Sequence, residues 1–155
     1  MSEQITHAAD IQVVTLKVGG QLFAIDLSVV DDVFKPERFT KIPAARAEIA
    51  GILNLRGRII VAIHTDRLLG LSSGKMDVVG RQMVNIKYLN ESYGLLADSV
   101  GDVMSLNGAD INPNPINLDG NLAKYSQGIL RFDDELMVVL KAEEMIAQVL
   151  EQDAA

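Results

Sequence analysis

Cysteine is absent from this chain of 155 residues. The protein therefore has no disulfide framework, no thiol nucleophile and no cysteine-ligated zinc. Long apolar runs are missing too, because none approaches the roughly 18 residues that a membrane-spanning helix needs, and the start of the chain carries no signal core. We expect a cytoplasmic protein with no direct membrane insertion.

Basic residues are scarce. Lysine and arginine number 14 against 21 acidic residues, which gives a formal net charge of −7. Nucleic acids and anionic membranes require a basic footprint, so no nucleic acid is expected as a partner and other proteins are favoured. With 48% hydrophobic and 23% charged residues, the chain has the composition of a folded globular protein.

Two common catalytic and metal-binding motifs are also missing, since GxxxxGK[ST] and HExxH do not occur. His64 and Asp66 stand two apart where a strand is predicted to end, which would place both side chains on one face. The second histidine, His7, lies near the start of the chain, so a solvated pair is favoured over a metal site. We predict no catalytic residue, no metal and no cofactor. A small-molecule or metal-binding barrel that uses His64, Asp66 and Arg58 remains the alternative.

Short β-branched segments between turn residues predict a mainly β protein. One hairpin joins 11–18 to 21–25 around Gly19-Gly20, and another joins the strands ILNL and RIIVAI at Arg56-Gly57. Further predicted elements are a short helix running into a strand at 27–34, an extended stretch between Pro36 and Pro43, strands at 84–89 and 92–100, a loop at 70–74, an irregular segment at 107–121 and a helix over 140–152.

The two halves of the chain resemble each other. A shift of 77 residues lays 51–53 on 128–130, 59–63 on 136–140 and 68–69 on 145–146. A shift of 70 lays 24–25 on 94–95, Val30 on Val100 and 32–34 on 102–104. Two β units of this size, each too small to be stable alone, imply paired barrels or sandwiches that share an interface.

Arg56 and Arg58 flank Gly57 at the second hairpin turn, and three readings are open: an anion site, a structural turn or a recognition surface. An anion site would need further glycines or a helix N-terminus nearby. In the repeat, Arg56-Gly57 falls on Asp133-Asp134. We therefore expect a turn that is structural in both halves and a charge that is free to serve recognition.

Valines recur beside acidic residues in both halves, at Val30, Val33, Val100 and Val103. Most valines at such positions belong to the core. If some of these are exposed where the halves meet, they would line a groove of the kind that accepts a partner helix.

Four segments resemble the CheW-type coupling proteins of bacterial chemotaxis: FAIDLSVVDDV, IAGILNLRGRIIVAI, GLLADSVGDVMSL with ADINPNP, and YSQGILRFDDELMVVLKAEEMI. The resemblance implies two five-stranded SH3-like barrels packed around a shared apolar core, with a C-terminal helix. It places one CheW-like domain over 11–150, made of two similar β subdomains with an interleaved boundary near 70–80. The segments 1–10 and 151–155 are expected to be flexible termini.

The resemblance also implies a non-enzymatic adaptor at membrane-associated receptor arrays. Its partners would be a CheA-type histidine kinase and the cytoplasmic tip of a methyl-accepting chemoreceptor. The receptor-facing groove would hold Val30, Asp32, Val33, Arg56 and Val103, with Asp32 and Arg56 as an ion pair and Gly57 as the structural turn residue.

Three positions depart from the family's usual pattern. The chain has Val61, His64 and Asp66 where the family usually has proline, aspartate and arginine. These positions follow the NLRG turn, so we expect the departures to affect the neighbouring surface. They motivate an alternative in which the adaptor serves a non-flagellar chemosensory pathway, for pili or a second messenger.

Overall fold

The computed structural model describes residues 10–42, 47–71 and 81–154. The strands are β1 (Asp10–Val18), β2 (Gln21–Asp26), β3 (Val30–Phe34), β4 (Ile49–Leu55), β5 (Arg58–Ile63), β6 (Gln82–Tyr88), β7 (Glu91–Ala97), β8 (Ser99–Asn107), β9 (Ser126–Phe132) and β10 (Glu135–Leu140). The helices are η1 (Leu27–Val29), α1 (Thr65–Leu68), η2 (Gly108–Asp110), α2 (Gly120–Tyr125) and α3 (Ala142–Ala154).

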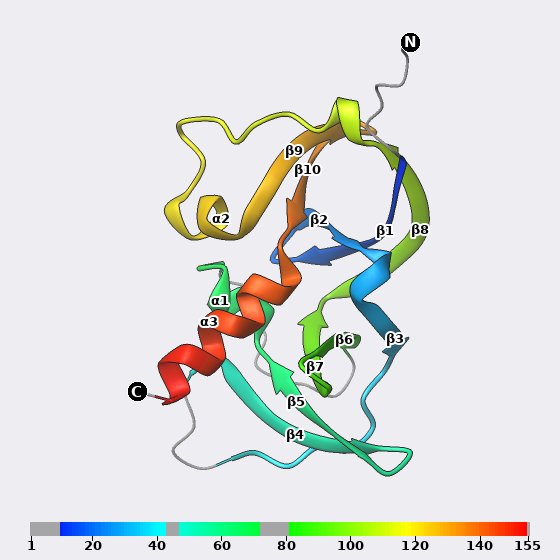
Figure 1. Ribbon diagram of the computed structural model, residues 1–155, viewed down its shortest axis with the longest axis vertical. Coiled ribbons are helices and arrows are strands. Elements are labelled where there is room, and N and C mark those ends of the chain that lie inside the picture. Colours follow the sequence, from blue (N-terminus) through cyan, green and yellow to red (C-terminus); the bar gives the residue numbers. More distant parts are fainter. Residues whose placement is uncertain (1–9, 43–46, 72–80, 155) are drawn as a thin grey trace.

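The strands form two five-stranded sheets, one above the other in Figure 1. The upper sheet has the order β8-β1-β2-β10-β9 and the lower sheet the order β3-β6-β7-β5-β4. Each curls into an SH3-like barrel, called here the upper and the lower barrel. α3 crosses between them on the left of the view. The predicted fold, two such barrels with a C-terminal helix, is confirmed.

The two barrels repeat the same hydrogen-bond register. Ile60 pairs with Ser92 in the lower barrel and Met137 with Leu22 in the upper one, which are the predicted shifts of 77 and 70. The halves exchange strands, because β3 pairs with β6 and β8 pairs with β1. Each barrel therefore contains strands from both halves of the chain, and neither half makes a barrel alone.

The apolar core has three parts. One cluster lies inside the upper barrel around Met137 and another inside the lower barrel around Ile60. The third lies between the barrels and includes Phe23 and Ile25 from the upper sheet, Leu95 from the lower sheet and Met145 from α3. This third cluster is the shared apolar core that the sequence predicted, and its burial holds the two barrels together.

Most predicted elements are present with small changes at their ends. Both hairpins form, and the segment 27–34 is a short helix followed by a strand, as expected. β1 begins one residue earlier than predicted, and α3 ends two residues later. Leu140 belongs to β10, so the C-terminal helix begins at Ala142. The predicted loop at 70–74 and the stretch up to Pro43 lie partly outside the described residues.

Two predictions about strands and loops were wrong. The single strand expected at 92–100 is broken at Asp98, whose carboxylate accepts a hydrogen bond from the Gly19 amide at 2.8 Å. The chain there leaves the lower sheet for the upper one. The segment 107–121 was expected to be irregular throughout, but it contains η2 and the start of α2, whose first turn is capped by the Asp119 side chain.

Among the helices of the described residues, none has the length and apolar character needed to cross a membrane.

Candidate partner-binding surface

The turn between β4 and β5 places two residues in the left-handed region. Arg56 has a φ of +53° and Gly57 a φ of +85°, and the Gly57 amide donates a hydrogen bond to Asn54 Oδ1 at 2.9 Å. Asp133 and Asp134 have φ values of +52° and +66° at the equivalent turn. This geometry belongs to a two-residue hairpin. The turn is structural in both halves, as predicted, and in the first half both of its central residues have a positive φ.

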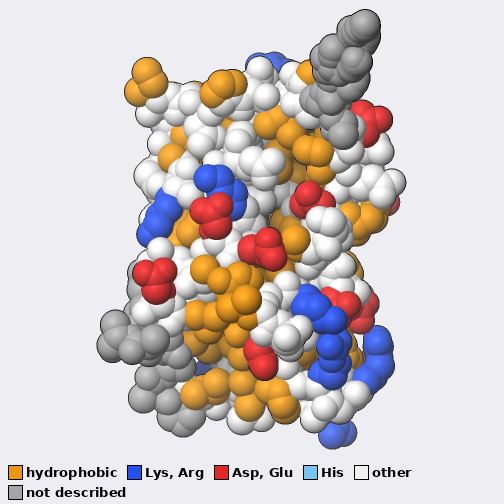
Figure 2. Space-filling view, viewed as in Figure 1, with side chains coloured by type: hydrophobic (Ala, Val, Ile, Leu, Met, Phe, Trp, Pro, Cys, Tyr) orange, Lys and Arg blue, Asp and Glu red, His pale blue; other side chains and the backbone are white. Residues whose placement is uncertain are grey.

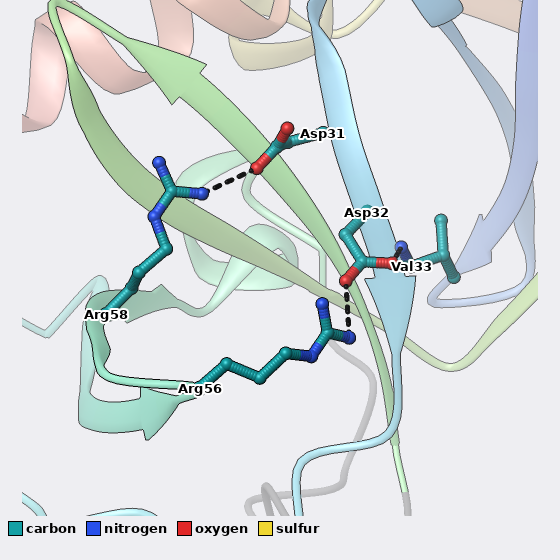
Figure 3. A network of polar contacts seen from close by, with 5 residues as sticks. All are labelled: Asp31, Asp32, Val33, Arg56 and Arg58. Atoms are coloured by element: carbon teal, nitrogen blue, oxygen red, sulfur yellow. Dashed lines mark hydrogen bonds and ion pairs between the residues drawn. The ribbon is translucent and has the colours of Figure 1, made fainter.

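A β-bulge in β3 turns two adjacent carboxylates toward that hairpin. Val30 pairs with Ile86 and Asp32 with Asn85, which leaves Asp31 as the extra residue. Asp32 meets the Arg56 guanidinium at 3.2 Å, and Asp31 meets that of Arg58 at 3.1 Å (Figure 3). We call these two ion pairs the clasp. It connects β3, at one end of the lower sheet, to the β4–β5 hairpin at the other end.

The Asp32–Arg56 ion pair is the one that the resemblance implied, whereas Asp31–Arg58 was missed. Both arginines carry a carboxylate partner, which argues against a free anion site at this turn. Figure 2 shows basic and acidic side chains next to each other at the lower right, in the part of the view where β3 lies. Because both arginine side chains are more than half exposed, the clasp lies on the molecular surface.

The valines that were predicted to line a groove differ in burial. Val30, Val33 and Val100 are half-buried and pack against the core between the barrels. Val103 is 52% exposed on β8, the terminal strand of the upper sheet. β3, the terminal strand of the lower sheet, carries Val30 and Val33. Val103 is thus partly exposed, whereas the expectation that this exposure belongs to a receptor groove stays a prediction.

A hollow of about 420 Å³ lies beneath the clasp. Its lining consists of Asp31, Asp32, Leu55, Arg56, Arg58, Ile60 and Asn85. Of the five predicted receptor-binding residues, Asp32 and Arg56 line this hollow, whereas the three valines do not. The structure thus brings the predicted charges together in the lower barrel and leaves Val103 on the upper one.

The equivalent end of the upper barrel has no such clasp. Asp102, Asp133 and Glu135 stand at the positions of Asp32, Arg56 and Arg58. Glu135 pairs instead with Lys17 at 3.2 Å. The two barrels therefore have the same backbone fold but different charges at this end. The lower barrel carries both acidic and basic side chains there, and the upper barrel carries mainly acidic ones.

His64 and Asp66 do not form the predicted solvated pair. β5 ends at Ile63, so His64 precedes α1 and Asp66 lies within it. Both side chains are buried, with His64 only 6% exposed, and Asp66 lies 4.0 Å from the equally buried Arg81. The prediction that both residues lie at the end of a strand was wrong, because the chain turns into a short helix, α1, that packs against β7. Arg58 pairs with Asp31, so it belongs to the clasp and not to this cluster.

The three departures from the family pattern therefore lie inside the protein. His64 and Asp66 are buried, and Val61 is half-buried against the core between the barrels. Any effect of His64 and Asp66 on the neighbouring surface would have to be indirect, because their side chains are buried, and the expected effect of the departures stays a prediction. Within the described residues, no group of three or more histidine, aspartate or glutamate side chains could hold a metal ion.

Burial lowers the pKa of His64 below its ordinary value of 6.5, and the nearby Arg67 and Arg81 guanidiniums act in the same direction, while Asp66 opposes them. At a pH below 6.5 but above this lowered pKa, His64 is protonated in the unfolded chain and neutral in the folded protein. The free energy of unfolding should fall as the pH drops below 6.5, by up to about 1.4 kcal/mol per pH unit. Denaturant melts between pH 7.5 and 5.5 measure this slope, and His64→Gln should reduce it. Equal slopes in parent and variant would contradict the prediction.

Reversing the charges of the clasp should show whether Asp32 and Arg56 interact. Arg56→Asp alone should lower the free energy of unfolding by no more than about 1 kcal/mol, because the pair is exposed. Asp32→Arg combined with Arg56→Asp should recover part of that loss. Thermal melts of the parent, both single variants and the double variant complete the cycle. A double variant that melts no higher than either single variant would mean that the pair contributes nothing.

The family model described as "CheW-like domain" matches residues 12–150 of this chain. The chain belongs to the CheW-like family. The chemotaxis protein CheW of Treponema pallidum is 29% identical over 134 residues, which cover 83% of this chain and 78% of that protein. Protein PilI of Pseudomonas aeruginosa is 26% identical over 84 residues, 54% of this chain and 47% of PilI.

A solved structure shows the same fold. The crystal structure of the scaffolding protein TtCheW from Thermoanaerobacter tengcongensis has a TM-score of 0.76 and 25% identity, and the match covers 94% of this chain and 93% of that one. The CheW-like fold thus includes both barrels and the exchanged strands that connect them. In this chain, the CheW-like NLRG segment is the part of β4 and its turn that carries Asn54, Arg56 and Gly57.

Proposed function

We propose that this chain is a non-enzymatic adaptor that binds a CheA-type histidine kinase and the cytoplasmic tip of a methyl-accepting chemoreceptor. The observation that carries the proposal is the match to the CheW-like domain over nearly the whole chain, together with the likeness to a scaffolding protein over 94% of this chain. The adaptor would act by binding alone, in the cytoplasm, at membrane-associated receptor arrays.

The receptor would bind where the terminal strands of the two sheets present their side chains. β3 carries Val30, Asp32 and Val33, and β8 carries Val103. Arg56 lies at the β4–β5 turn, where it pairs with Asp32. Half-buried valines next to an exposed ion pair suit an amphipathic helix, whose apolar face covers the valines and whose polar edge meets the charges.

The kinase would dock at the end of each barrel that carries the β4–β5 or the β9–β10 turn. Ile59 and Leu136 are 54% and 42% exposed and occupy equivalent positions, 77 residues apart, beside the β4–β5 and β9–β10 turns. Exposed large apolar side chains that recur at equivalent places support a binding role. Ile59→Glu and Leu136→Glu are the variants that address this part of the proposal.

The direct test mixes the purified protein with a CheA-type regulatory domain and with a receptor signalling fragment from the same host. We expect co-elution or a titratable signal with each, at about micromolar affinity, because adaptors in arrays rely on multivalency. No signal with either partner up to about 100 μM, well above that range, would contradict the proposal.

A second candidate is an adaptor for a non-flagellar chemosensory pathway. The likeness to Protein PilI over 84 residues favours it. The genes next to the one that encodes this chain would distinguish the two, since flagellar and pilus systems bring different neighbours. Deleting the gene and scoring swimming against surface motility tests the same choice.

A further inference from the structure

One residue that lines the hollow beneath the clasp, Asn85, carries a buried acceptor atom. Asn85 lies on β6, pairs with Asp32 across the sheet, lines the hollow and is only 2% exposed. Within the described residues, no group donates a hydrogen bond to its Oδ1 atom. An unsatisfied buried acceptor is costly, so a native protein normally supplies a donor from its own chain, a solvent molecule or a ligand.

The upper barrel satisfies the equivalent position internally. Thr15 takes the place of Asn85, and its hydroxyl donates a hydrogen bond to the Asp102 carbonyl at 3.2 Å. The Cβ that an alanine would add at Gly101 would lie 2.5 Å from that hydroxyl, so the strands are closely packed there. The lower barrel has Asp31 at the position of Gly101, and a hollow where the upper barrel has this close contact. Among the described residues, this position therefore carries an unpartnered acceptor in the lower barrel and a hydrogen-bonded hydroxyl in the upper one.

The walls of the hollow define the chemistry of a ligand. Two guanidiniums and two carboxylates cancel in net charge, which favours a neutral group. Arg56 and Arg58 keep exposed N–H groups at the rim, since each has one carboxylate partner and five donors. A ligand must therefore accept at the rim and donate to Asn85 on the floor. Leu55 and Ile60 offer apolar walls for a short methylene stem.

We propose that this hollow binds the carboxamide side chain of an asparagine or glutamine on a partner protein, a step that rests on the proposed binding of a receptor. A carboxamide carries an acceptor and a donor on one planar group. A carboxylate would leave Asn85 unsatisfied and face two aspartates, and an ammonium group would face two arginines. Asn85 thereby becomes a specificity residue inside the lower barrel, beneath the Arg56–Asp32 pair.

The first experiment is independent of any receptor. The ¹⁵N-labelled full chain is titrated with N-acetylglutaminamide and, as the matched apolar probe, with N-acetylnorleucinamide. The glutamine probe should shift the Asn85 side-chain amide saturably, with a Kd of about 1 mM. Asn85→Thr, which copies the upper barrel, should weaken binding about fivefold, the loss expected of one neutral hydrogen bond.

Two further variants keep the test decisive if Asn85→Thr fails to fold. Arg58→Met removes one of the two rim arginines and should also weaken binding of the glutamine probe about fivefold. Arg131→Met, which changes an exposed residue on β9 of the other barrel, should leave binding unchanged. Equal chemical-shift changes with the glutamine and norleucine probes would contradict the proposed carboxamide site. The proposal would also be wrong if Arg58→Met, and Asn85→Thr where it folds, bound the glutamine probe as tightly as the parent does.

The second experiment identifies the source of the carboxamide. Each asparagine and glutamine of a receptor signalling fragment is changed to alanine, and binding is measured against the parent and against Asn85→Thr. One of these changes should weaken binding to the parent about fivefold and have no effect with Asn85→Thr. Probe binding without any such coupled residue would overturn the assignment to a receptor side chain. A fragment that does not bind the parent at all would refute the receptor part of the proposed function, whatever the probe titration gives.

Discussion

Gly51→Ala should lower the free energy of unfolding by about 3 kcal/mol or more, the largest stability loss that we expect from a single methyl group. Gly51 lies on β4 where a second segment crosses it, and Thr40 and Ile52 exchange two backbone hydrogen bonds of 2.8 Å. A Cβ on Gly51 would lie 2.2 Å from the Thr40 carbonyl oxygen. The methyl group must therefore push the crossing segment away and break both bonds.

A thermal or denaturant melt measures this effect, and a drop of about 3 kcal/mol corresponds to roughly 6–12 °C for a domain of this size. Gly57→Ala is the matched control, because no described residue lies within 4 Å of the added Cβ and the positive φ of +85° is what opposes the change. That control should lose about 1–2 kcal/mol. If Gly51→Ala melts no lower than Gly57→Ala, the close crossing at Thr40 does not limit stability.

Val103→Asp should weaken binding to a receptor fragment at least about tenfold, because the partner would have to desolvate a new carboxylate. The same change should leave the melting temperature nearly unaffected, since Val103 is 52% exposed on the outer strand of the upper barrel. Titration of the variant with the fragment, beside a thermal melt, measures both quantities.

Two controls separate a binding effect from a folding effect. Val103→Thr keeps the shape of the side chain and should bind almost as the parent does. Val14→Asp changes the buried register partner of Val103 on β1 and should unfold the protein, because it places a charge in the core. A large fall in the melting temperature of Val103→Asp would show that Val103 is a core residue after all.

Local patterns were enough to predict much of the fold. Gly19-Gly20 and Arg56-Gly57 marked the hairpins because two-residue turns need a positive φ, and alternating apolar segments marked their strands. The repeat at 70 and 77 residues predicted that each strand has a counterpart in equivalent surroundings. The Asp32–Arg56 pair came from the family resemblance, which preserves the NLRG turn, and the receptor-binding role of its residues remains a prediction.

Burial near the end of β5 could not be predicted in the same way. His64 and Asp66 look like polar residues at a strand end, and nothing in their neighbours along the chain places Arg81 beside them. Their burial depends on α1 packing against β7, a contact between residues that lie about thirty positions apart. Asp31 was missed for a related reason, since the bulge that turns it toward Arg58 exists only in the pairing of β3 with β6.

The β character of the chain, its hairpins, its internal repeat and the family to which it belongs follow from the amino-acid sequence, because they depend on local conformational preference and on residue identity. The exchange of strands between the halves became visible in the three-dimensional fold alone. A repeated strand can make the same hydrogen bonds with either copy of its partner, so the sequence leaves that choice open. The same long-range pairing leaves the Asn85 Oδ1 atom without a donor among the described residues of the lower barrel, while the Thr15 hydroxyl has an acceptor in the upper one.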